Sequence, residues 1–537
     1  MCSTSTTKRA CSTQERNYKM TGKKDEKMGL PNNANTAMNN MTISDSKNSE
    51  NHKQPQLVTI LKALAQQKVA TFQFPGHNRG RAAPSSLSDV IGVQPFLHDI
   101  SMPPEIGSLF ALEGPIWNAQ KKAAELFGAT QTWFLVGGTT CGIQASIMAT
   151  CSPGDILILP RNAHKSTFSS MVLSGAIPKY ITSEYDSDWD IVGSITPSQV
   201  EEAIQELDDQ GLKASAILIT SPTYHGICSN LEKISLLCHS HNIPIIVDEA
   251  HGAHLGFHEK FPQSALNQGV DISIQSTHKI LSSLTQSSML HMSGKLVDRE
   301  RLCQCLQSLQ STSASYLLLA SLDAARAQLS GNPKTIFNKA VEIAMEAKNF
   351  IEKIPGITVL NCDDPLRITI GVWKLGISGF VANEILYEEG VIAELSGTRS
   401  LTFAINLGTT RDDVMRLVSG LRHISETYDS LIRANEKGSN DVHIKAFLGT
   451  TATSGMILSP REAFFASKTS VSCKDGIGKV CGELVCPYPP GIPLLIPGEV
   501  ITEEALSYVV EVLQNGGFVS GAADPGLSTI VICVNPA

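Results

Sequence analysis

Residues 243–251 read Ile-Pro-Ile-Ile-Val-Asp-Glu-Ala-His, an apolar run that ends in two acids and a histidine. A short run of this kind is typical of a strand that is buried on both faces of a sheet. An acid that closes a buried strand needs a partner, because an unpaired buried carboxylate is costly. An alternative interpretation is that Asp248 only caps the next turn. The stretch predicts a central strand with Asp248 at its carboxyl end.

The same pattern recurs between about residues 130 and 288, where short apolar runs alternate with amphipathic stretches. The predicted strands are 133–136, 155–159, 214–220, 243–247 and 272–275. The predicted helices between them include 142–150, 197–210 and 230–241. Strands that alternate with helices predict right-handed βαβ units and a mostly parallel sheet that is covered on both faces. In such a sheet ligands bind beyond the carboxyl ends of the strands.

Several of these strand ends carry polar residues. Residues 137–140 (Gly-Gly-Thr-Thr) lead into a predicted helix, whose N-terminal amides could cradle an anion, although the same residues suit an ordinary tight turn. His164 follows the next strand, where it could also be a surface or capping residue. Residues 221–226 are again polar and aromatic, and they are equally explained as a proline turn.

Lys279 follows the predicted strand 272–275, in the segment Ser-Thr-His-Lys. A lysine is rarely buried without a partner, and desolvation lowers its pKa, which suits a lysine that forms a Schiff base. Together the strand ends supply an anion site, an imidazole or aromatic ring that could stack on a ligand, an acid and an amine. These are the groups that hold pyridoxal phosphate, so the sequence predicts a site for this cofactor.

The motifs along the chain resemble those of the Orn/Lys/Arg decarboxylases, which are fold-type I pyridoxal-phosphate enzymes. The resemblance extends from about residue 57 to the C-terminus, and it is to the compact class without the N-terminal wing domain. Its last two motifs lie outside the predicted cofactor domain and favour these decarboxylases over aminotransferases. The motifs are 74–80 (FPGHNRG), 113–116 (EGPI), 137–140 (GGTT), 248–251 (DEAH), 276–279 (STHK), 311–316 (STSASY), 487–493 (PYPPGIP) and 497–499 (PGE).

The resemblance implies a role for each matching residue. Lys279 would form the Schiff base and Asp248 would pair with the pyridine nitrogen of the cofactor. His164 would stack on one face of the ring, and His278 would lie near the substrate carboxylate, so that Lys279 or His278 returns a proton to the substrate. The other residues that it assigns to the cofactor are Gly138, Thr139, Thr140, Ala250, His251, Ser276 and, from a second subunit, Thr312 or Ser313.

The reaction implied is decarboxylation of a basic amino acid, which is arginine, lysine or ornithine, to agmatine or a diamine plus CO2. A cationic side chain needs an acid partner, for which the candidates are Glu483 and Glu394, although each could be an ordinary solvated carboxylate. One alternative is another fold-type I reaction, such as that of an aminotransferase, aldolase or lyase. Another is a non-catalytic partner, which is disfavoured because Lys279, Asp248 and His164 are all present. A site shared between subunits implies a homodimer or a higher homo-oligomer.

The composition argues against other classes of protein. The 537 residues carry 43 Lys+Arg and 51 Asp+Glu, a formal net charge of −8, which argues against nucleic-acid binding. No apolar run approaches the roughly 18 residues that a membrane span needs. The 13 cysteines include no C-x-x-C pair, which indicates a reducing compartment and predicts no metal site.

Residues 1–56 differ from the rest of the chain, since they are rich in Ser, Thr, Asn and Lys and nearly free of large apolar side chains. We expect a disordered leader. Its start is basic, rich in hydroxyls and poor in acids, which is typical of a transit peptide to a plastid or other organelle, although a dispensable cytoplasmic tail also fits. The predicted architecture after it is a pyridoxal-phosphate-binding large α/β domain at 57–329, a small α/β domain at 330–438 and a C-terminal α+β decarboxylase domain at 439–537.

Overall fold

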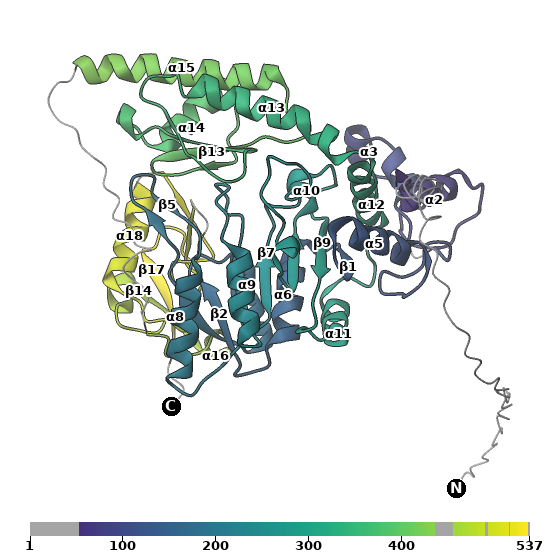
Figure 1. Ribbon diagram of the computed structural model, residues 1–537, viewed down its shortest axis with the longest axis horizontal. Helices are drawn as coiled ribbons and strands as arrows, with labels where there is room; N and C mark the ends of the chain where they lie inside the picture. Colours follow the sequence, from purple (N-terminus) through teal and green to yellow (C-terminus); the bar gives the residue numbers. More distant parts are fainter. Residues whose placement is uncertain (1–52, 102, 435–454, 489–491, 515, 535–537) are drawn as a thin grey trace, which may run out of the picture. The chain divides into compact units, whose positions relative to one another are not determined.

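The computed structural model describes residues 53–101, 103–434, 455–488, 492–514 and 516–534 (Figure 1). Nearly all of the predicted leader, and with it the question of a transit peptide, lies outside these residues. Among the helices of the described ranges, none is long and apolar enough to cross a membrane.

A seven-stranded sheet contains the apolar run that ends at Asp248. Its strands lie in the order β1 (Gln131–Leu135), β9 (Ser288–Met292), β8 (Ile272–Gln275), β7 (Ile245–Asp248), β6 (Ala214–Thr220), β2 (Ile156–Pro160) and β3 (Ile177–Ile181). Strands β3, β2, β6, β7 and β8 are parallel, whereas β9 is antiparallel to both β8 and β1. The mostly parallel sheet is therefore confirmed. All residues of β7 and β8 are buried, which explains why these strands read as continuous apolar runs.

Helices cover both faces of this sheet. Along β2, Leu157 and Leu159 pack into the core of one face and Ile158 into that of the other, because successive side chains of a strand point to opposite faces. The helices on the first face are α6 (Gly138–Thr150), α7 (Lys165–Ser174) and α11 (Arg299–Leu309). Those on the second face are α8 (Pro197–Asp208) and α9 (Leu231–Ser240). Helix α6 begins at Gly138, earlier than the predicted 142, so the predicted glycine turn forms its first turn.

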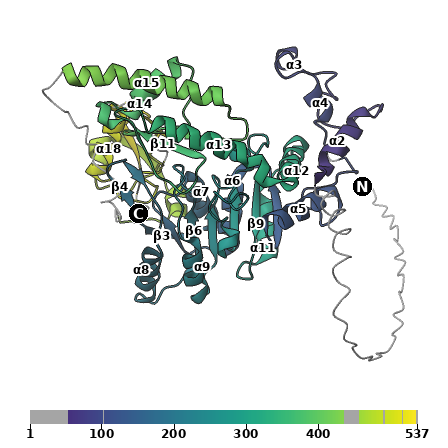
Figure 2. The same ribbon diagram turned by 45° about the horizontal axis from the view of Figure 1, so that its top comes forward.

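The N-terminal helices pack beside the β1 edge of the sheet. They are α2 (Gln56–Gln66), α3 (Ser85–Ile91), α4 (Gln94–His98) and α5 (Gly114–Phe127). Helices α2 and α5 contact α12 (Tyr316–Gly331), and Figure 2 shows α3 farther from the sheet than α2. The Leu57 amide donates to Asp323 Oδ2 at 2.9 Å, and Asp323 also forms a fully buried ion pair with Arg326 at 2.8 Å. This pair therefore ties the start of α2 to α12.

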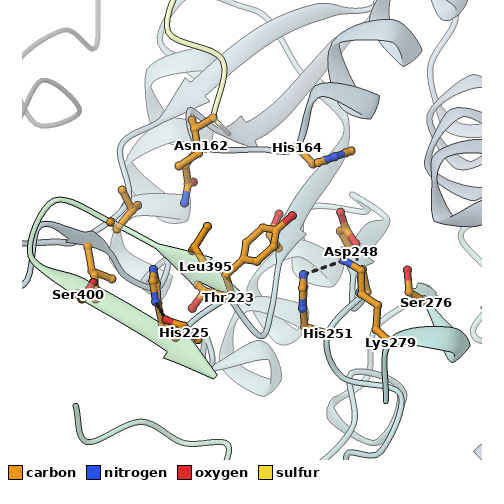
Figure 3. Close-up of a pocket in the computed structure, with 18 of the residues that line it drawn as sticks. Asn162, His164, Thr223, His225, Asp248, His251, Ser276, Lys279, Leu395 and Ser400 are labelled. Atoms are coloured by element: carbon orange, nitrogen blue, oxygen red, sulfur yellow. Dashed lines mark hydrogen bonds between the residues drawn. The ribbon is translucent and has the colours of Figure 1, made fainter. Parts of the chain in front are cut away.

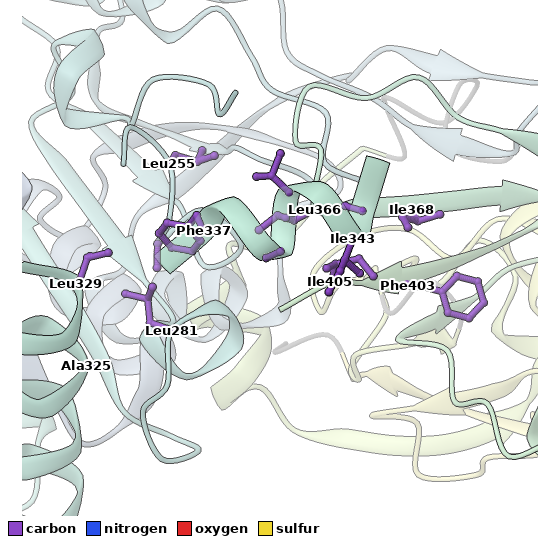
Figure 4. Close-up of a cluster of buried hydrophobic side chains, with 14 of the residues drawn as sticks. Leu255, Leu281, Ala325, Leu329, Phe337, Ile343, Leu366, Ile368, Phe403 and Ile405 are labelled. Carbon is purple, nitrogen blue, oxygen red and sulfur yellow. The ribbon is translucent and has the colours of Figure 1, made fainter. Parts of the chain in front are cut away.

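A second unit follows the predicted break at residues 330–333. Asn332 caps the next helix, since its side chain accepts a hydrogen bond from the Thr335 amide at 3.2 Å. The unit contains the helices α13 (Pro333–Ile351), α14 (Gly379–Glu388) and α15 (Arg411–Ala434), and an antiparallel sheet in the order β10 (Thr358–Val359), β11 (Arg367–Gly371), β13 (Ser400–Ala404) and β12 (Leu395–Ser396). Its core is continuous with that of the large unit, because Phe337 and Leu366 pack in one cluster with Leu281 (Figure 4).

The C-terminal unit has its own apolar core, and its helix α16 lies against α7. The Arg161 guanidinium, just after β2, donates to the carbonyls of Pro493 and Leu494 at 2.8 Å and to Glu499 at 3.0 Å. We propose residues 57–329, 330–438 and 439–537 as the three domains. The elements of the C-terminal unit are α16 (Pro460–Phe465), β14 (Lys468–Ser472), α17 (Cys473–Gly476), β15 (Cys486–Tyr488), α18 (Glu503–Gln514), β16 (Phe518–Ser520) and β17 (Thr529–Cys533).

Candidate active site

A cavity of about 320 Å³ lies at the carboxyl ends of the parallel strands (Figure 3). Residues that follow β2, β6, β7 and β8 line it, as expected for a sheet of this topology. The small unit contributes residues of the segment 395–402, and the C-terminal unit contributes Ile492 and Tyr508. All three units therefore meet around one site.

Lys279 lies in α10 (Thr277–Ile280), directly after β8, and its side chain lines the cavity. Its Nζ atom is 2.9 Å from Nε2 of His251. Burial lowers the pKa of Lys279, the charges of Asp248 and Glu394 raise it, and the charge of Arg367 lowers it. The net direction is downward, as an amine that must act as a nucleophile requires.

The two adjacent acids at the end of β7 have different surroundings. Asp248 lines the cavity, is 6% exposed, and accepts a hydrogen bond from the Ala250 amide at 3.2 Å. Glu249 is held in the interior by the Ser273 hydroxyl at 2.6 Å, and by Gln275 and the Ala265 amide at 2.9 Å each. Asp248 is therefore the acid available to a ligand, while Glu249 is fixed in the core.

His164 caps α7 and also lines the cavity, so its capping role is compatible with a place in the candidate site. Its Nδ1 accepts a hydrogen bond from the Ser166 amide at 3.2 Å, which leaves the proton of the neutral ring on Nε2. Burial lowers the pKa of His164, the charge of Asp248 raises it, and the charges of Lys279 and Lys165 lower it. The lowered pKa favours the neutral ring.

The N-terminus of α6 opens into the cavity through Gly138, Thr139 and Thr140. No side chain caps this helix, and Gly138 has φ 70°, so the amides of the first turn are not covered by a capping group. The Ser276 hydroxyl donates to the Thr139 hydroxyl at 3.3 Å, which brings a further polar group to the same end. An uncapped helix N-terminus with hydroxyls attracts phosphate. With Asp248 and Lys279 in the same cavity, the residues present fit pyridoxal phosphate.

Of the other residues that the resemblance assigns to the site, three line the cavity and two do not. Ala250, His251 and His278 line the cavity, and His278 Nδ1 donates to the Ser287 carbonyl at 2.9 Å. Thr312 and Ser313 are exposed in the loop between α11 and α12, and they are not among the residues that line the cavity.

The two predicted substrate carboxylates also lie outside the lining of the cavity. Glu394 is exposed just before β12, although its charge reaches Lys279. Glu483 is fixed within the C-terminal unit, where its carboxylate accepts hydrogen bonds from the amides of Ala523 at 2.6 Å and Val531 at 2.7 Å. Of the two, Glu394 is the one that acts on the site electrostatically.

Four cavity or near-cavity residues were missed as site candidates. Tyr224, whose ring centroid is 4.2 Å from that of His251, and His225 lie in the segment 221–226, where the polar strand end was a usable signal. Arg367 in β11 and Asp190 between β4 (Tyr185–Asp186) and β5 (Ile191–Val192) had no such signal. Neither follows a strand of the predicted parallel sheet.

Comparisons with known proteins agree on one family. Residues 55–375 match the family "Orn/Lys/Arg decarboxylase, major domain", and residues 441–519 match "Orn/Lys/Arg decarboxylase, C-terminal domain". The arginine decarboxylase of Bacillus subtilis is 36% identical over 491 residues, and that of Halalkalibacterium halodurans is 37% identical over 488 residues. Each alignment covers 89% of this chain and 97% of the relative.

The lysine decarboxylases are more distant relatives. The constitutive lysine decarboxylase of Escherichia coli is 24% identical in sequence, over 84% of this chain and 76% of that protein. Its solved structure superposes with a TM-score of 0.77 at 23% identity, covering 91% of this chain and 83% of that one. The Francisella novicida lysine decarboxylase superposes with a TM-score of 0.76 at 24% identity, covering 90% and 80%. These structures share the fold.

Proposed function

The chain belongs to the Orn/Lys/Arg decarboxylase family, and we propose that its substrate is arginine, which it converts to agmatine and CO2. The family and the named relatives make it a pyridoxal-phosphate-dependent decarboxylase of a basic amino acid. One observation carries the choice of arginine. Two relatives named arginine decarboxylase are 36% and 37% identical, whereas the constitutive lysine decarboxylase is only 24% identical.

A substrate assay tests this choice. The purified enzyme is loaded with pyridoxal phosphate, and CO2 release is measured from arginine, lysine and ornithine. We expect the highest kcat/KM for arginine, by roughly tenfold or more, because a pocket discriminates side chains that differ in length and polar contacts by about this factor. A preference for lysine or ornithine would overturn the arginine proposal, and formation of a keto acid without CO2 would instead favour transamination.

We propose that the site residues act as follows. The first turn of α6 and the Ser276 hydroxyl hold the cofactor phosphate, Lys279 binds its aldehyde, and Asp248 keeps the proton on its pyridine nitrogen. When bound, pyridoxal phosphate accepts the electrons released from the substrate as CO2 leaves. His278 could return the proton from Nε2 only in its doubly protonated form, because Nδ1 already carries the proton donated to the Ser287 carbonyl.

We propose further that Asp190 binds the cationic end of the substrate. Among the described residues that line the cavity, the carboxylates are Asp248 and Asp190, and Asp248 lies beside Lys279. Asp190 has φ 54°, a conformation that is rare for a residue other than glycine. The Tyr185 hydroxyl donates to it at 2.5 Å, and so does the Thr398 hydroxyl. A carboxylate has about four acceptor positions, so capacity remains for a guanidinium.

The Asp190→Asn variant tests this assignment. We expect the KM for arginine to rise by roughly 10- to 100-fold with a smaller change in kcat, because a charge-assisted hydrogen bond to the substrate is lost. The amide oxygen of asparagine still accepts from one of the two hydroxyls, Tyr185 or Thr398. Asp186→Asn, an exposed aspartate of the same hairpin, is the matched control. A KM within twofold of the wild-type value would contradict the proposal.

We propose that the enzyme works as a homodimer. The side chains of Phe72 and Phe74 are 99% and 84% exposed, and apolar groups this exposed often mark an interface. We expect light scattering to give twice the mass of the chain, and the double variant Phe72→Ser/Phe74→Ser to shift the population towards monomer with loss of activity. Leu236→Ser, at a 68% exposed position on α9, is the control. A fully active monomer would refute the dimer.

A further inference from the structure

The imidazole of His251 lies between the side-chain amine of Lys279 and the guanidinium of Arg367. Its Nε2 is 2.9 Å from Lys279 Nζ, a contact drawn as a dashed line in Figure 3, and its Nδ1 is 3.2 Å from Arg367 Nη2. His251 and Arg367 are only 5% and 3% exposed. Lys279 comes from the end of β8 and Arg367 from β11 of the small sheet, so the contact exists only because the two units pack together.

The donor properties of these groups fix the position of the proton on the ring. A guanidinium can only donate hydrogen bonds, so Nδ1 of His251 must accept from Arg367. A neutral imidazole whose Nδ1 accepts carries its proton on Nε2, where it can donate to Lys279. Nζ of Lys279 can accept that bond only as a neutral amine, because an ammonium group has no lone pair.

We propose that Arg367 holds His251 in its Nε2–H tautomer and that His251 in turn holds Lys279 as a neutral amine whenever the lysine is not bound to the cofactor. Both are positioning residues, since they act through Lys279. The inference rests on the proposed function, because it assigns how the nucleophile of that reaction is prepared. Neither residue was assigned this role by the sequence.

The charged groups around His251 support a neutral ring. Burial lowers the pKa of His251 well below its ordinary value, and Lys279, Arg367, His164 and His225 all lower it further. Burial and Arg367 lower the pKa of His225 to about 4, so His225 adds little charge at neutral pH. A neutral His251 has one proton to place, and the contact with Arg367 decides where it lies.

The charged groups around Lys279 act in both directions. Asp248 at the end of β7 and Glu394 before β12 favour the ammonium form, while burial and the charge of Arg367 favour the amine. The Tyr224 ring, 5.4 Å from Nζ, is an uncharged phenol at neutral pH, since burial and the charge of Asp248 raise its pKa to about 12. Because two carboxylates favour the ammonium form of Lys279, burial is opposed. The hydrogen bond from His251 adds a further preference for the neutral amine.

The consequence is measurable without any substrate. An ordinary lysine has a pKa near 10.4, so only about one in 2,500 is neutral at pH 7, and only the neutral form attacks an aldehyde. The full chain, stripped of cofactor, is mixed with pyridoxal phosphate, and the rate constant of combination is followed by absorbance across pH. We expect the wild-type rate to reach its plateau at a pH well below the lysine value.

Three variants separate the tautomer from the simple charge effect. Arg367→Met removes the donor and the charge, while His251→Phe removes the imidazole and leaves the charge of Arg367 in place. We expect both to shift the midpoint upward by about one pH unit or more, and so to slow combination at pH 7 by about tenfold or more. Arg367→Lys keeps a donor and a charge, and we expect its midpoint to stay close to the wild-type value.

Each outcome decides for or against the proposal. If Arg367→Met shifts the midpoint and His251→Phe does not, charge alone acts and the tautomer proposal is overturned, and it is equally overturned if neither variant shifts it. Should Arg367→Met fail to fold, His251→Phe still tests the proposal, because it removes the imidazole and leaves the charge of Arg367 in place: an unshifted midpoint in this variant overturns it. Because no amino acid is present, a wrong choice of substrate would appear only in the CO2 assay, and the two failures remain distinguishable.

Discussion

Lys279→Ala is expected to abolish decarboxylation, lowering kcat by roughly a thousandfold or more, because the group that binds the cofactor aldehyde is lost. Among the described residues that line the cavity, Lys279 is the only lysine, so no neighbouring amine can replace it. The anion cradle at α6 does not involve its side chain, so we expect the variant still to bind cofactor non-covalently.

Two measurements check this result. The loaded wild-type enzyme should show a visible absorbance band that survives gel filtration. Borohydride should bleach this band and leave the cofactor covalently attached, whereas Lys279→Ala should show no trapped cofactor. Lys295→Ala, at an exposed position after β9, is the control and should keep both the band and the activity. Partial recovery of Lys279→Ala by added methylamine would identify the missing group as an amine. Wild-type trapping in Lys279→Ala would refute the assignment.

Asp323→Ala is expected to have the largest effect on stability, lowering the free energy of unfolding by about 3–5 kcal/mol. Both side chains of the Asp323–Arg326 pair are 0% exposed, and removal of one partner leaves the charge of Arg326 in the core without this carboxylate. The Leu57 amide loses its acceptor as well, so the start of α2 should loosen with it. Urea unfolding, followed by circular dichroism, measures the change.

A double variant provides the control for this prediction. Asp323→Leu/Arg326→Met removes both charges and fills the space with apolar side chains, and we expect it to recover most of the loss, since replacement of a whole buried ion pair is often close to neutral. If Asp323→Ala unfolds at the wild-type urea concentration, the pair contributes little. If the double variant is as unstable as Asp323→Ala, the cost lies in lost packing and hydrogen bonds.

Much of the parallel sheet could be predicted because its signals are local. The runs 214–220 and 272–275 match β6 and β8 residue for residue. The run 243–247 begins two residues before β7 and stops one residue short of its end. The antiparallel strand β9 was missed because its sequence, Ser-Met-Leu-His-Met, contains a histidine and no β-branched residue. His291 is tolerated there because it bonds to Thr132 at 2.8 Å and to Gln275 at 3.1 Å, contacts that no local pattern reveals.

The residues of the candidate site were also predicted in part from local sequence and in part decided by the fold. Strand-end motifs brought Lys279, Asp248 and His164 to attention, and these residues do line one cavity. The sequence also indicated Asp248 rather than its neighbour Glu249, and the fold directs the first into the cavity and the second into a hydrogen-bond network of the core. The different surroundings of the two acids depend on which face of the sheet is open, which is a tertiary property.

The sequence by itself determined five of the seven strands of the sheet and the chemistry at its edge, because periodicity and strand-end motifs are properties of neighbouring residues. Only the tertiary structure decided what surrounds that chemistry. It brought Arg367 to His251 across 116 positions of the chain and Thr398 to Asp190 across 208. It also placed Glu483 outside the lining of the cavity, where its carboxylate accepts from two backbone amides. The physical reason is that charge and hydrogen-bond partners act through space, and their separation along the chain leaves no local trace.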